Sequence, residues 1–427
     1  MAPAREYAMR VAIVGGGVAG ALLALRTVLA PRAARGEQVH PRSPRRAGGP
    51  QGEQGARDSA ADDRHAHRVL PGRADGGVVA PAREYAMRVA IVGGGVAGAL
   101  LALRTARAPG GARVDLFTAR SPRREDASGV SGGLVRGFET STDACRTAAE
   151  SLAEIRSSDT LLDWTGYRET GSLYVLSGGS GTDGPAEVVD AYLPGSAEVI
   201  GRDTVIRDFP FRTLPADAVA VVERYAGHIS PHRLRTAALE EAVSLGVTVR
   251  PAPVDAVTRD PAVRTADGGT VRYDRVVVAA GAWTPHLLDR SGLPVAGLRT
   301  KQIQYSLCET PLSGLGSFVD ECSGLYGRPY GDGTFLLGLP SDRWDVDPDT
   351  VAPDVPLERR VTECARRVFG VAVTAGRTVA SCDCYHDPAG LVLRRVGPGL
   401  HTFTGGSGGA AKTVLSASRT AATALLA

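Results

Sequence analysis

Apolar residues in the second part of the chain follow two patterns. Two runs, 87–92 and 276–280, are almost continuously apolar, as in parallel strands buried on both faces of a sheet. Two other segments, 145–157 and 235–244, repeat apolar residues at helical spacing, and Ser230 is placed to cap the second helix. This mixture predicts an α/β protein in which helices cover a parallel sheet.

Further segments carry strand signals, several of them with the alternating pattern of a sheet that has one buried face. These expected strands are 171–177, 247–254, 301–309, 325–339, 391–395 and 400–404, with a hairpin turn at 267–269. The region from 87 to 427 also opens and closes with a strand, a glycine-rich turn and a helix. This order predicts a doubly wound, Rossmann-like nucleotide-binding domain with an inserted domain built on a mixed or antiparallel sheet.

The first strand of this region leads directly into a glycine-rich turn. Residues 87–98 read Met-Arg-Val-Ala-Ile-Val-Gly-Gly-Gly-Val-Ala-Gly, which places Gly-x-Gly-x-x-Gly at Gly93, Gly95 and Gly98 before an apolar helix. This strand, turn and helix form the context that the dinucleotide-binding fingerprint requires. Glycines allow a tight turn and close backbone approach, so the N-terminus of the helix can receive a pyrophosphate.

The fingerprint occurs twice in the chain. Residues 2–27 are identical to 80–105, at an offset of 78. After the first copy the strand and helix pattern is lost, whereas the second copy continues into another strand at 111–118. We interpret 1–79 as a duplicated, disordered extension and Met87 as the native start, because one strand and helix without partners cannot bury their faces. A genuine repeat domain is the alternative interpretation.

The amino-acid composition argues against several classes of protein. The 427 residues are 43% hydrophobic and 22% charged with a net charge of +3, which is ordinary for a globular protein and gives no sign of a nucleic-acid partner. The sequence has no uninterrupted apolar stretch of about 18–20 residues, so no membrane span is predicted. The six cysteines lack zinc-ligand spacing. They indicate a reducing cytoplasm and predict no metal site.

Several landmarks, in the correct order over 87–427, resemble the FAD-dependent amine oxidoreductases of the D-amino-acid oxidase and monomeric sarcosine oxidase type. The landmarks are the turn at 93–98, the stretch 127–136 with Ser128 and Ser131, residues 227–231, residues 276–283 with Gly281 and Trp283, and the loop 404–412 with Gly405, Gly406, Gly408 and Gly409. The resemblance implies an FAD cofactor. It also implies oxidation of the C–N bond of an amino acid or secondary amine to an imine, with oxygen as the acceptor and hydrogen peroxide as a product.

The same resemblance gives the expected domains. Residues 87–135, 220–290 and 375–427 would form a discontinuous FAD-binding domain, and 136–219 with 291–374 would form the substrate-binding domain. A small amine or amino acid and oxygen are the expected partners, and the sequence does not set the oligomeric state.

The sequence departs from the family pattern in two places. The second strand of a dinucleotide fold normally ends in an acid that binds the ribose hydroxyls. Here that position holds Thr118 or Ala119, and the nearest acids are at 125–126, so ribose recognition would depend on other contacts. The C-terminal loop has Gly-Ala-Ala at 409–411 instead of the usual histidine and aromatic residue. This indicates a roomier pocket or an altered choice of substrate.

Three basic residues are the predicted catalytic groups. Only two of the 49 basic residues are lysines, Lys301 and Lys412. By resemblance, Lys412 and Arg136 would form a clamp for the substrate carboxylate, and Lys301 would promote the reaction with oxygen, since a positive charge stabilises nascent superoxide. The alternatives are chance surface or edge-strand lysines and, for Arg136, a solvated or phosphate-neutralising arginine.

Two cysteines resemble the segment through which several family members attach FAD covalently. Cys382 has the expected distance from Pro388, and Cys384 is the alternative register. A buried thiol pair or a metal site with His386 would be the other interpretations, although no second ligand pair is evident.

Two other functions stay open at this point. A flavin-dependent monooxygenase or halogenase could use the same nucleotide domain, but it would need a reductase or NAD(P)H. A catalytically degenerate flavoprotein would fit the missing ribose acid. Production of peroxide with an amine and without NAD(P)H would separate the oxidase from both.

Overall fold

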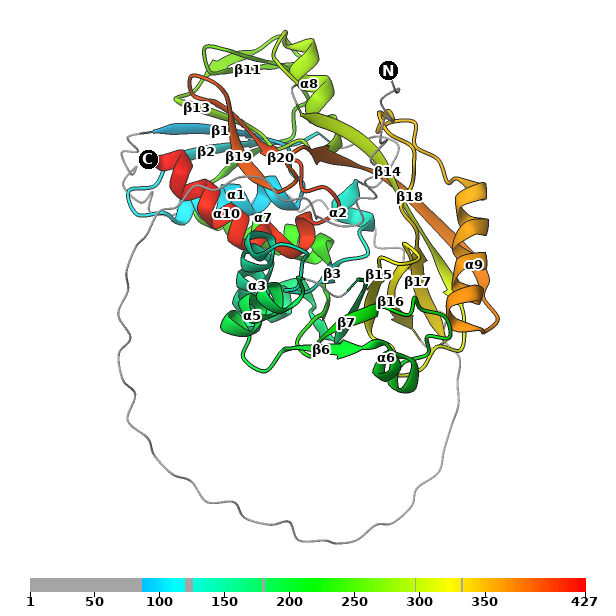
Figure 1. The fold of residues 1–427 in the computed structure, drawn as a ribbon. Coiled ribbons are helices and arrows are strands. Elements are labelled where there is room, and N and C mark those ends of the chain that lie inside the picture. Colours follow the sequence, from blue (N-terminus) through cyan, green and yellow to red (C-terminus); the bar gives the residue numbers. More distant parts are fainter. Residues whose placement is uncertain (1–86, 120–125, 179–180, 296, 332) are drawn as a thin grey trace, which may run out of the picture. The chain divides into compact units, whose positions relative to one another are not determined.

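The computed structural model describes residues 87–119, 126–178, 181–295, 297–331 and 333–427 (Figure 1). The duplicated stretch 1–79 and Glu125 lie outside these ranges, so the predictions made for them are not tested. The described residues contain two large sheets and two small ones.

The first large sheet has six strands in the order β19-β20-β13-β1-β2-β9. Neighbours from β20 to β9 are parallel, and only β19 is antiparallel to its neighbour. The strands are β1 (Arg88–Val92), β2 (Arg113–Phe117), β9 (Thr248–Arg250), β13 (Arg275–Val278), β19 (Val392–Gly397) and β20 (Leu400–Thr404). The two continuously apolar runs, now β1 and β13, are confirmed as central parallel strands.

Helices cover one face of this sheet. They are α1 (Val96–Arg107), α7 (Pro231–Ser244) and α10 (Ala410–Leu426), with α3 (Thr142–Arg156) packed against α10 (Figure 1). The other face carries α8 (Thr284–Arg290) and the small sheet of β10 (Val254–Thr258), β11 (Ala262–Thr265) and β12 (Thr270–Arg272). Strand β1 therefore buries Val89 and Ile91 on one side and Ala90 and Val92 on the other.

Two predicted strands are interrupted. The expected strand 325–339 is divided into β16 (Tyr326–Gly331) and β17 (Thr334–Gly338), which pair antiparallel. The segment 247–254 was expected to be continuous, but β9 ends at Arg250 and β10 begins at Val254 in another sheet. Pro251 and Pro253 lie between them, and proline has no N–H group to donate to a strand ladder. The expected cap of α7 is confirmed, since the Ser230 side chain accepts a hydrogen bond from the Arg233 amide.

The second large sheet has eight strands in the order β18-β14-β17-β16-β15-β5-β7-β6. All neighbours are antiparallel except β15 and β5. The strands are β5 (Ser172–Ser177), β6 (Ala197–Gly201), β7 (Ala218–Glu223), β14 (Leu298–Glu309), β15 (Ser317–Asp320), β16 (Tyr326–Gly331), β17 (Thr334–Gly338) and β18 (Thr374–His386). Strand β7 and most of β18 come from segments that were assigned to the FAD-binding domain, so the domain boundaries stay a prediction.

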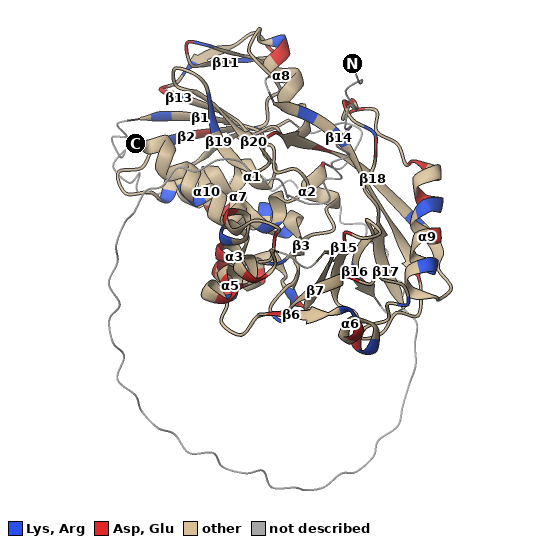
Figure 2. Ribbon diagram, viewed as in Figure 1, with Lys and Arg blue, Asp and Glu red and all other residues tan. Residues whose placement is uncertain are grey.

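Helix α9 (Val355–Phe369) covers one face of the eight-stranded sheet (Figure 1). Charged residues of both signs lie along it (Figure 2), while its opposite side enters the core. The rings of Phe211, Phe318 and Phe369 meet there edge to face, with centroids 5.1–6.1 Å apart. This aromatic cluster fixes the helix against the sheet.

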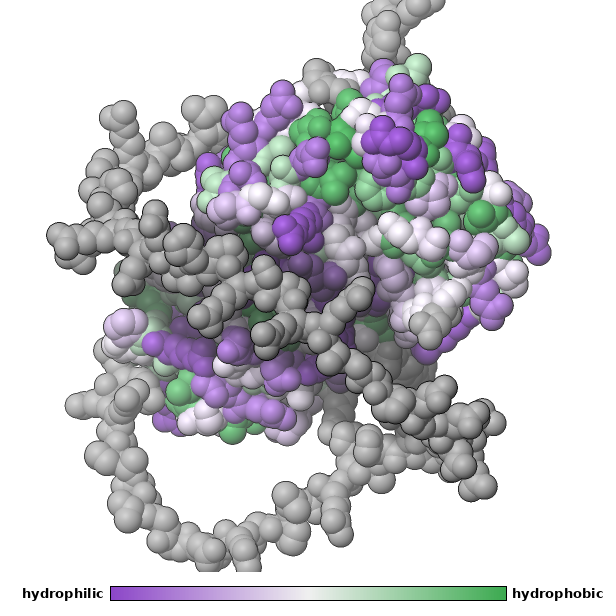
Figure 3. All heavy atoms as spheres, turned by 90° about the horizontal axis from the view of Figure 1, so that it is seen from below, coloured by the Kyte–Doolittle hydropathy of each residue, from purple (hydrophilic) through white to green (hydrophobic). Residues whose placement is uncertain are grey.

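The remaining elements are short or peripheral. They are α2 (Ala127–Val130), α4 (Asp159–Thr165), α5 (Asp183–Tyr192), α6 (Arg202–Asp208), the 3-10 turn η1 (Gly281–Trp283), and a small sheet of β3 (Leu134–Val135), β8 (Gly227–His228) and β4 (Arg168–Glu169). On the face drawn in Figure 3, hydrophobic and hydrophilic residues are interspersed where the surface is visible. In the part of the chain that the structure describes, every helix is too short or too polar to cross a bilayer.

The aromatic cluster under α9 predicts a large effect of truncation. Phe369 is 0% exposed, so Phe369→Ala should lower the free energy of unfolding by about 3–5 kcal/mol. Val243→Ala is the control, because Val243 is 53% exposed and its truncation should change the free energy by about 0.5 kcal/mol or less. Urea denaturation measures both values. Equal losses in the two variants would contradict the packing described here.

Candidate active site

The glycine turn between β1 and α1 brings three backbone segments into close contact. The Gly93 amide donates to the Phe117 carbonyl at 2.8 Å, and Gly93 has a φ of 124°. A Cβ atom on Gly93 would overlap the carbonyl of Ala279, and one on Gly98 would overlap the carbonyl of Gly93. Only glycine fits at these two positions, because the turn, the start of α1 and the end of β13 meet there.

The N-terminus of α1 has the features of an anion site. Its first turn is Val-Ala-Gly-Ala, and the backbone at the N-cap, Gly95, is extended. The Ser128 hydroxyl accepts from the Val96 amide at 3.1 Å, so the stretch after β2 reaches this end of the helix. Ser131 accepts from the Gly133 amide at 3.1 Å and shapes the turn into β3. Free amides, the helix dipole and a nearby hydroxyl suit a pyrophosphate.

The ribose end of the nucleotide site differs from the usual pattern. A Cβ atom on Gly94 would lie 2.6 Å from the Thr118 hydroxyl, so Thr118 stands beside the glycine turn. Asp126 instead caps α2 and pairs with Arg235 at 2.7 Å. Asp115, within β2, is buried and accepts from the Tyr273 hydroxyl at 2.7 Å. Both described acids near β2 are therefore engaged elsewhere.

The glycine loop before α10 lies against β18. The Gly408 amide donates to Asp383 Oδ2 at 2.9 Å, and the Ser407 amide donates to the Cys384 carbonyl at 3.2 Å. Gly406 forms a bridge with Tyr385. Burial raises the pKa of the Asp383 carboxyl. Two segments that the sequence singled out separately are thus brought together.

This contact also explains two of the loop glycines. Gly405 and Gly408 have φ angles of 82° and 79°, a region that favours glycine. A Cβ atom on Gly405 would press on the His386 side chain, and one on Gly408 would lie 3.1 Å from the Tyr385 hydroxyl. On Gly409, it would lie 3.0 Å from the Lys412 side chain. The loop is therefore packed against both β18 and the lysine that follows it.

The two cysteines of β18 lie in different surroundings. Cys382 packs with Ala282 and Val351, and Trp283 borders the same cluster. Cys384 belongs instead to the core on that face of the six-stranded sheet which α8 and the small sheet β10–β12 cover. Burial raises the pKa of each thiol to about 12, so both are protonated at neutral pH. Gly281, at the start of η1, has a φ of 53° and open space around its Cβ position.

Lys301 is a buried cation among aromatic rings. Its strand, β14, lies between β18 and β17, so it is not an edge strand. The ammonium is 4.5 Å from the ring centroid of Trp344 and 5.4 Å from that of Tyr385. Burial lowers the pKa of Lys301, and Asp342 partly opposes this effect. The lysine therefore lies beside Tyr385, whose hydroxyl borders the glycine loop.

The other two predicted basic residues meet at a third residue that the sequence did not single out. Arg136 and Lys412 are 5% and 6% exposed, and both form ion pairs with the carboxylate of Glu139. The distance from Arg136 Nη2 to Glu139 Oε1 is 3.1 Å. Glu139 itself is only 1% exposed. The one available sequence signal is the spacing of three residues between Arg136 and Glu139, which does not reveal burial.

Two more carboxyl groups surround this ion cluster. Glu223 accepts from the amides of Gly137 and Phe138 at 2.7 and 3.0 Å, and Glu321 accepts from the Tyr174 hydroxyl. Burial raises the pKa of both carboxyl groups. Burial, and next the charge of Arg136, lower the pKa of Lys412. Burial opposes the charged form of Arg136 as well, but nearby acids, Glu139 first, leave its pKa raised.

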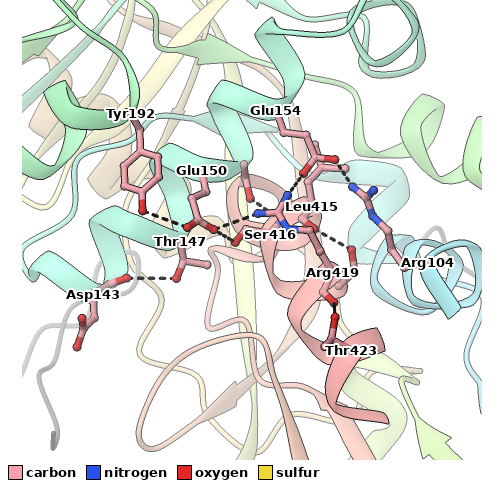
Figure 4. Close-up of polar contacts among 12 residues, drawn as sticks. Arg104, Asp143, Thr147, Glu150, Glu154, Tyr192, Leu415, Ser416, Arg419 and Thr423 are labelled. Atoms are coloured by element: carbon pink, nitrogen blue, oxygen red, sulfur yellow. Dashed lines mark hydrogen bonds and ion pairs between the residues drawn. The ribbon is translucent and has the colours of Figure 1, made fainter. Parts of the chain in front are cut away.

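Helix α10, which carries Lys412, is tied to α3 by a second set of charges. Arg419 lies between Glu150 and Glu154 of α3, at 3.1 and 2.7 Å (Figure 4). Ser416 donates to Glu150 at 2.6 Å, and Arg104 of α1 pairs with Glu154. These contacts fix the position of α10 along α3, and with it the position of Lys412.

Strand register shows which residues share the sheet face opposite α9. Gln304 donates to the Asp354 carbonyl before α9, so Tyr305 points to the other face. The register of paired residues can be followed from β14 across β17, β16 and β15 to β5. It aligns Tyr305, Tyr326 and Tyr174 in one row across the sheet. We call these three residues the tyrosine row.

The tyrosine row faces the predicted flavin-contacting stretch. The Tyr305 hydroxyl donates to the Val130 carbonyl at 2.8 Å, and the Arg136 guanidinium lies 4.9 Å from the Tyr174 ring centroid. Tyr330, also considered from the sequence, is 53% exposed and stands apart from the row. Within the described ranges, no group of three or more His, Cys, Asp or Glu residues could hold a metal ion.

The parallel sheet, the glycine turn and the second sheet define a two-domain nucleotide-binding oxidoreductase. The chain belongs to the FAD-dependent oxidoreductase family (DAO), whose model matches residues 88–424. This confirms the resemblance seen in the sequence. FAD is the cofactor of the family, and the turn and α1 fit its pyrophosphate.

Relatives agree with this assignment. Monomeric sarcosine oxidase of Streptomyces avermitilis is 27% identical over 205 residues, which cover 46% of this chain and 51%, about half, of that protein. L-Proline dehydrogenase from P. horikoshii has a TM-score of 0.65 at 15% identity, covering 79% of this chain and 92% of its own. Glycine oxidase from Geobacillus kaustophilus has a TM-score of 0.61 at 20% identity, covering 80% and 95%. The two solved structures show the shared fold.

The turn geometry predicts different results for two glycine substitutions. Gly93→Ala should lower the free energy of unfolding of the FAD-free protein by about 2–5 kcal/mol, because of its φ and the overlap with Ala279. Gly95→Ala should cost about 1 kcal/mol or less but weaken FAD binding at least about tenfold, since its methyl group would stand at the anion site. Denaturation and fluorescence titration with FAD measure the two effects. Equal stability of the two variants would contradict this account.

Proposed function

We propose that this chain oxidises the C–N bond of an amine or amino acid to an imine, with oxygen as the electron acceptor. The observation that carries the proposal is the meeting of the glycine loop 405–409 with β18 beside Lys301. The loop resembles the one that covers the flavin ring in related enzymes. Tyr385, which pairs with the loop at Gly406, also has its ring centroid 5.4 Å from the Lys301 ammonium, so a buried positive charge would stand near the flavin ring.

FAD, when bound, would supply the hydride acceptor for the carbon next to nitrogen, and through it two electrons and two protons would pass to oxygen to give hydrogen peroxide. The chain's own residues would bind and orient the reactants. The amides at the N-terminus of α1, together with Ser128, would hold the pyrophosphate. The tyrosine row would position the substrate and exclude water.

The sequence spacing favours Cys382 for covalent attachment of FAD, although β18 pairs Cys382 with Gln302 and so turns its thiol to the sheet face opposite Lys301. Cys382 shares a cluster with Ala282 and borders Trp283, which belong to a predicted flavin-contacting landmark. Cys384 lies in the other core cluster. Because the Cys382 thiol is protonated at neutral pH, attachment would need the thiol to lose its proton as the bond forms.

The cellular location and the competing functions depend on other residues. The six cysteines, all within the described ranges, are free thiols, which supports a reducing cytoplasmic location. A degenerate flavoprotein is the second candidate, and the acids near β2 that are engaged elsewhere favour it. A monooxygenase or halogenase would need NAD(P)H or a reductase.

The first test uses the purified full chain. We expect a flavin spectrum that an amine bleaches without oxygen, and release of hydrogen peroxide in air without NAD(P)H. After acid precipitation the yellow colour should stay in the pellet, and Cys382→Ala should release it, whereas Cys384→Ala should not. A flavin that amines reduce only in the presence of NAD(P)H, or do not reduce at all, would remove the oxidase proposal.

The buried lysine predicts a selective kinetic effect. Lys301→Met should slow reoxidation of the reduced protein by oxygen at least about tenfold, because the positive charge is lost. Reduction by the amine should change less than about threefold. Lys301→Arg, which keeps the charge, should retain more oxygen reactivity than the methionine variant. Stopped-flow kinetics measure the rate of reduction by the amine and the rate of reoxidation by oxygen separately. An equal decrease of both rates would argue for a merely structural lysine.

A further inference from the structure

We propose that the substrate of this enzyme carries no carboxylate beside the C–N bond that is oxidised, because Glu139 already occupies the Arg136–Lys412 anion site. The inference rests on the proposed function and names its substrate class. In the predicted clamp, Arg136 and Lys412 bind the carboxylate of the substrate. In this structure they bind the carboxylate of Glu139, a residue of the chain itself.

The geometry of the cluster leaves no unpaired cation for a second anion. Glu139 contacts both Arg136 and Lys412, and all three residues are 6% exposed or less. Arg136 is held further by its Nε, which donates to the Phe138 carbonyl at 3.1 Å. A substrate carboxylate could reach these cations only by displacing Glu139, which would leave a buried charge without its partners.

The surrounding charges also oppose a second anion. Glu223 and Glu321 both act on the charge of Arg136. A fourth carboxyl group would therefore enter a site that holds two cations and three acids. Burial raises the pKa of Glu223 and Glu321, so the charge that most directly opposes a second anion is that of Glu139, which lies between the two cations.

One oxygen atom of the cluster favours a substrate that brings a hydrogen-bond donor instead of a carboxylate. Both carboxylate oxygens of Glu139 are buried and accept no hydrogen bond from any residue that the structure describes, and Arg136 Nη2 is likewise a buried donor without an acceptor. The ion pairs with Arg136 and Lys412 are formed through Oε1, so Oε2 is the oxygen that is free to accept from a substrate. A buried carboxylate oxygen without a donor is costly, and an N–H group would satisfy it. The atom therefore fits a substrate that brings N–H donors and no negative charge.

Arg328 is the main competing position for a carboxylate. It lies on the same sheet face as the tyrosine row, and its side chain donates to the carbonyls of Gly132 and Pro329. Among the described residues, Arg328 has no carboxylate within ion-pair distance. The test must therefore separate the two positions.

The test measures binding of acetate, the smallest carboxylate probe, by calorimetry and by the flavin difference spectrum. Wild-type protein should show no saturable binding. Glu139→Gln should bind acetate saturably, with a Kd at least about tenfold below the highest acetate concentration at which wild type shows no binding, because the two cations become available. The matched control is Glu150→Gln, which removes a carboxylate from the other ion cluster and should behave as wild type. Circular dichroism confirms that each variant is folded.

A second measurement needs only the wild-type enzyme. N-methylpropylamine should reduce the flavin with a kcat/KM at least about tenfold higher than N-methylglycine. This comparison holds even if Glu139→Gln does not fold. The reverse order of the two amines would overturn the proposal.

The remaining outcomes are also distinct. Saturable acetate binding to wild type, unchanged in Glu139→Gln, would overturn the inference, and its loss in Arg328→Leu would place the carboxylate at Arg328. Calorimetry does not depend on the flavin. A chain that binds no FAD, or whose flavin no amine reduces, would instead defeat the proposed function.

Discussion

The buried carboxylate of Glu139 is the constraint on which the centre of this molecule depends. Two buried cations cannot stay charged in a protein interior without an anion between them. Glu139 supplies that anion, and in doing so it joins the segment after β3 to the C-terminal helix α10. Glu223 of β7 fixes the same segment by accepting two of its backbone amides. One cluster thus connects the eight-stranded sheet, through β7, with α10 of the helix layer that covers the six-stranded sheet.

Helix α10 links the ion cluster around Glu139 to the glycine loop 405–409. Its N-terminal end follows the glycine loop that packs on β18, its first turn carries Lys412, and its middle is tied to α3 through Arg419. A shift of the helix would therefore disturb the loop and the ion cluster together. The contacts of Arg419 with Glu150 and Glu154 (Figure 4) lie further along the helix than Lys412, yet they help to fix the position of Lys412 because both residues belong to α10.

Most of the fold can be predicted from signals between neighbouring residues. Features that depend on burial between distant residues cannot. The fingerprint strand, its glycine turn and the cap at Ser230 are encoded by neighbouring residues, so the sequence predicts them correctly. Helix α9 is not among the elements predicted from the sequence, although Asp354 caps it and Gly370 ends it; its few buried apolar residues are separated by many charged ones. Glu139 could not be predicted as a site residue, since the fact that matters is its burial between residues far apart in sequence.

The two lysines show how composition and structure inform each other. In a chain whose other basic residues are arginines, both lysines are 6% exposed, although lysine is rarely buried unless it is paired. Lys301 is surrounded by aromatic rings and Lys412 meets a carboxylate, two environments that suit a compact ammonium. The planar, larger guanidinium would not fit either place in the same way. Both lysines therefore lie in the interior, in surroundings that suit a compact ammonium, rather than at the surface.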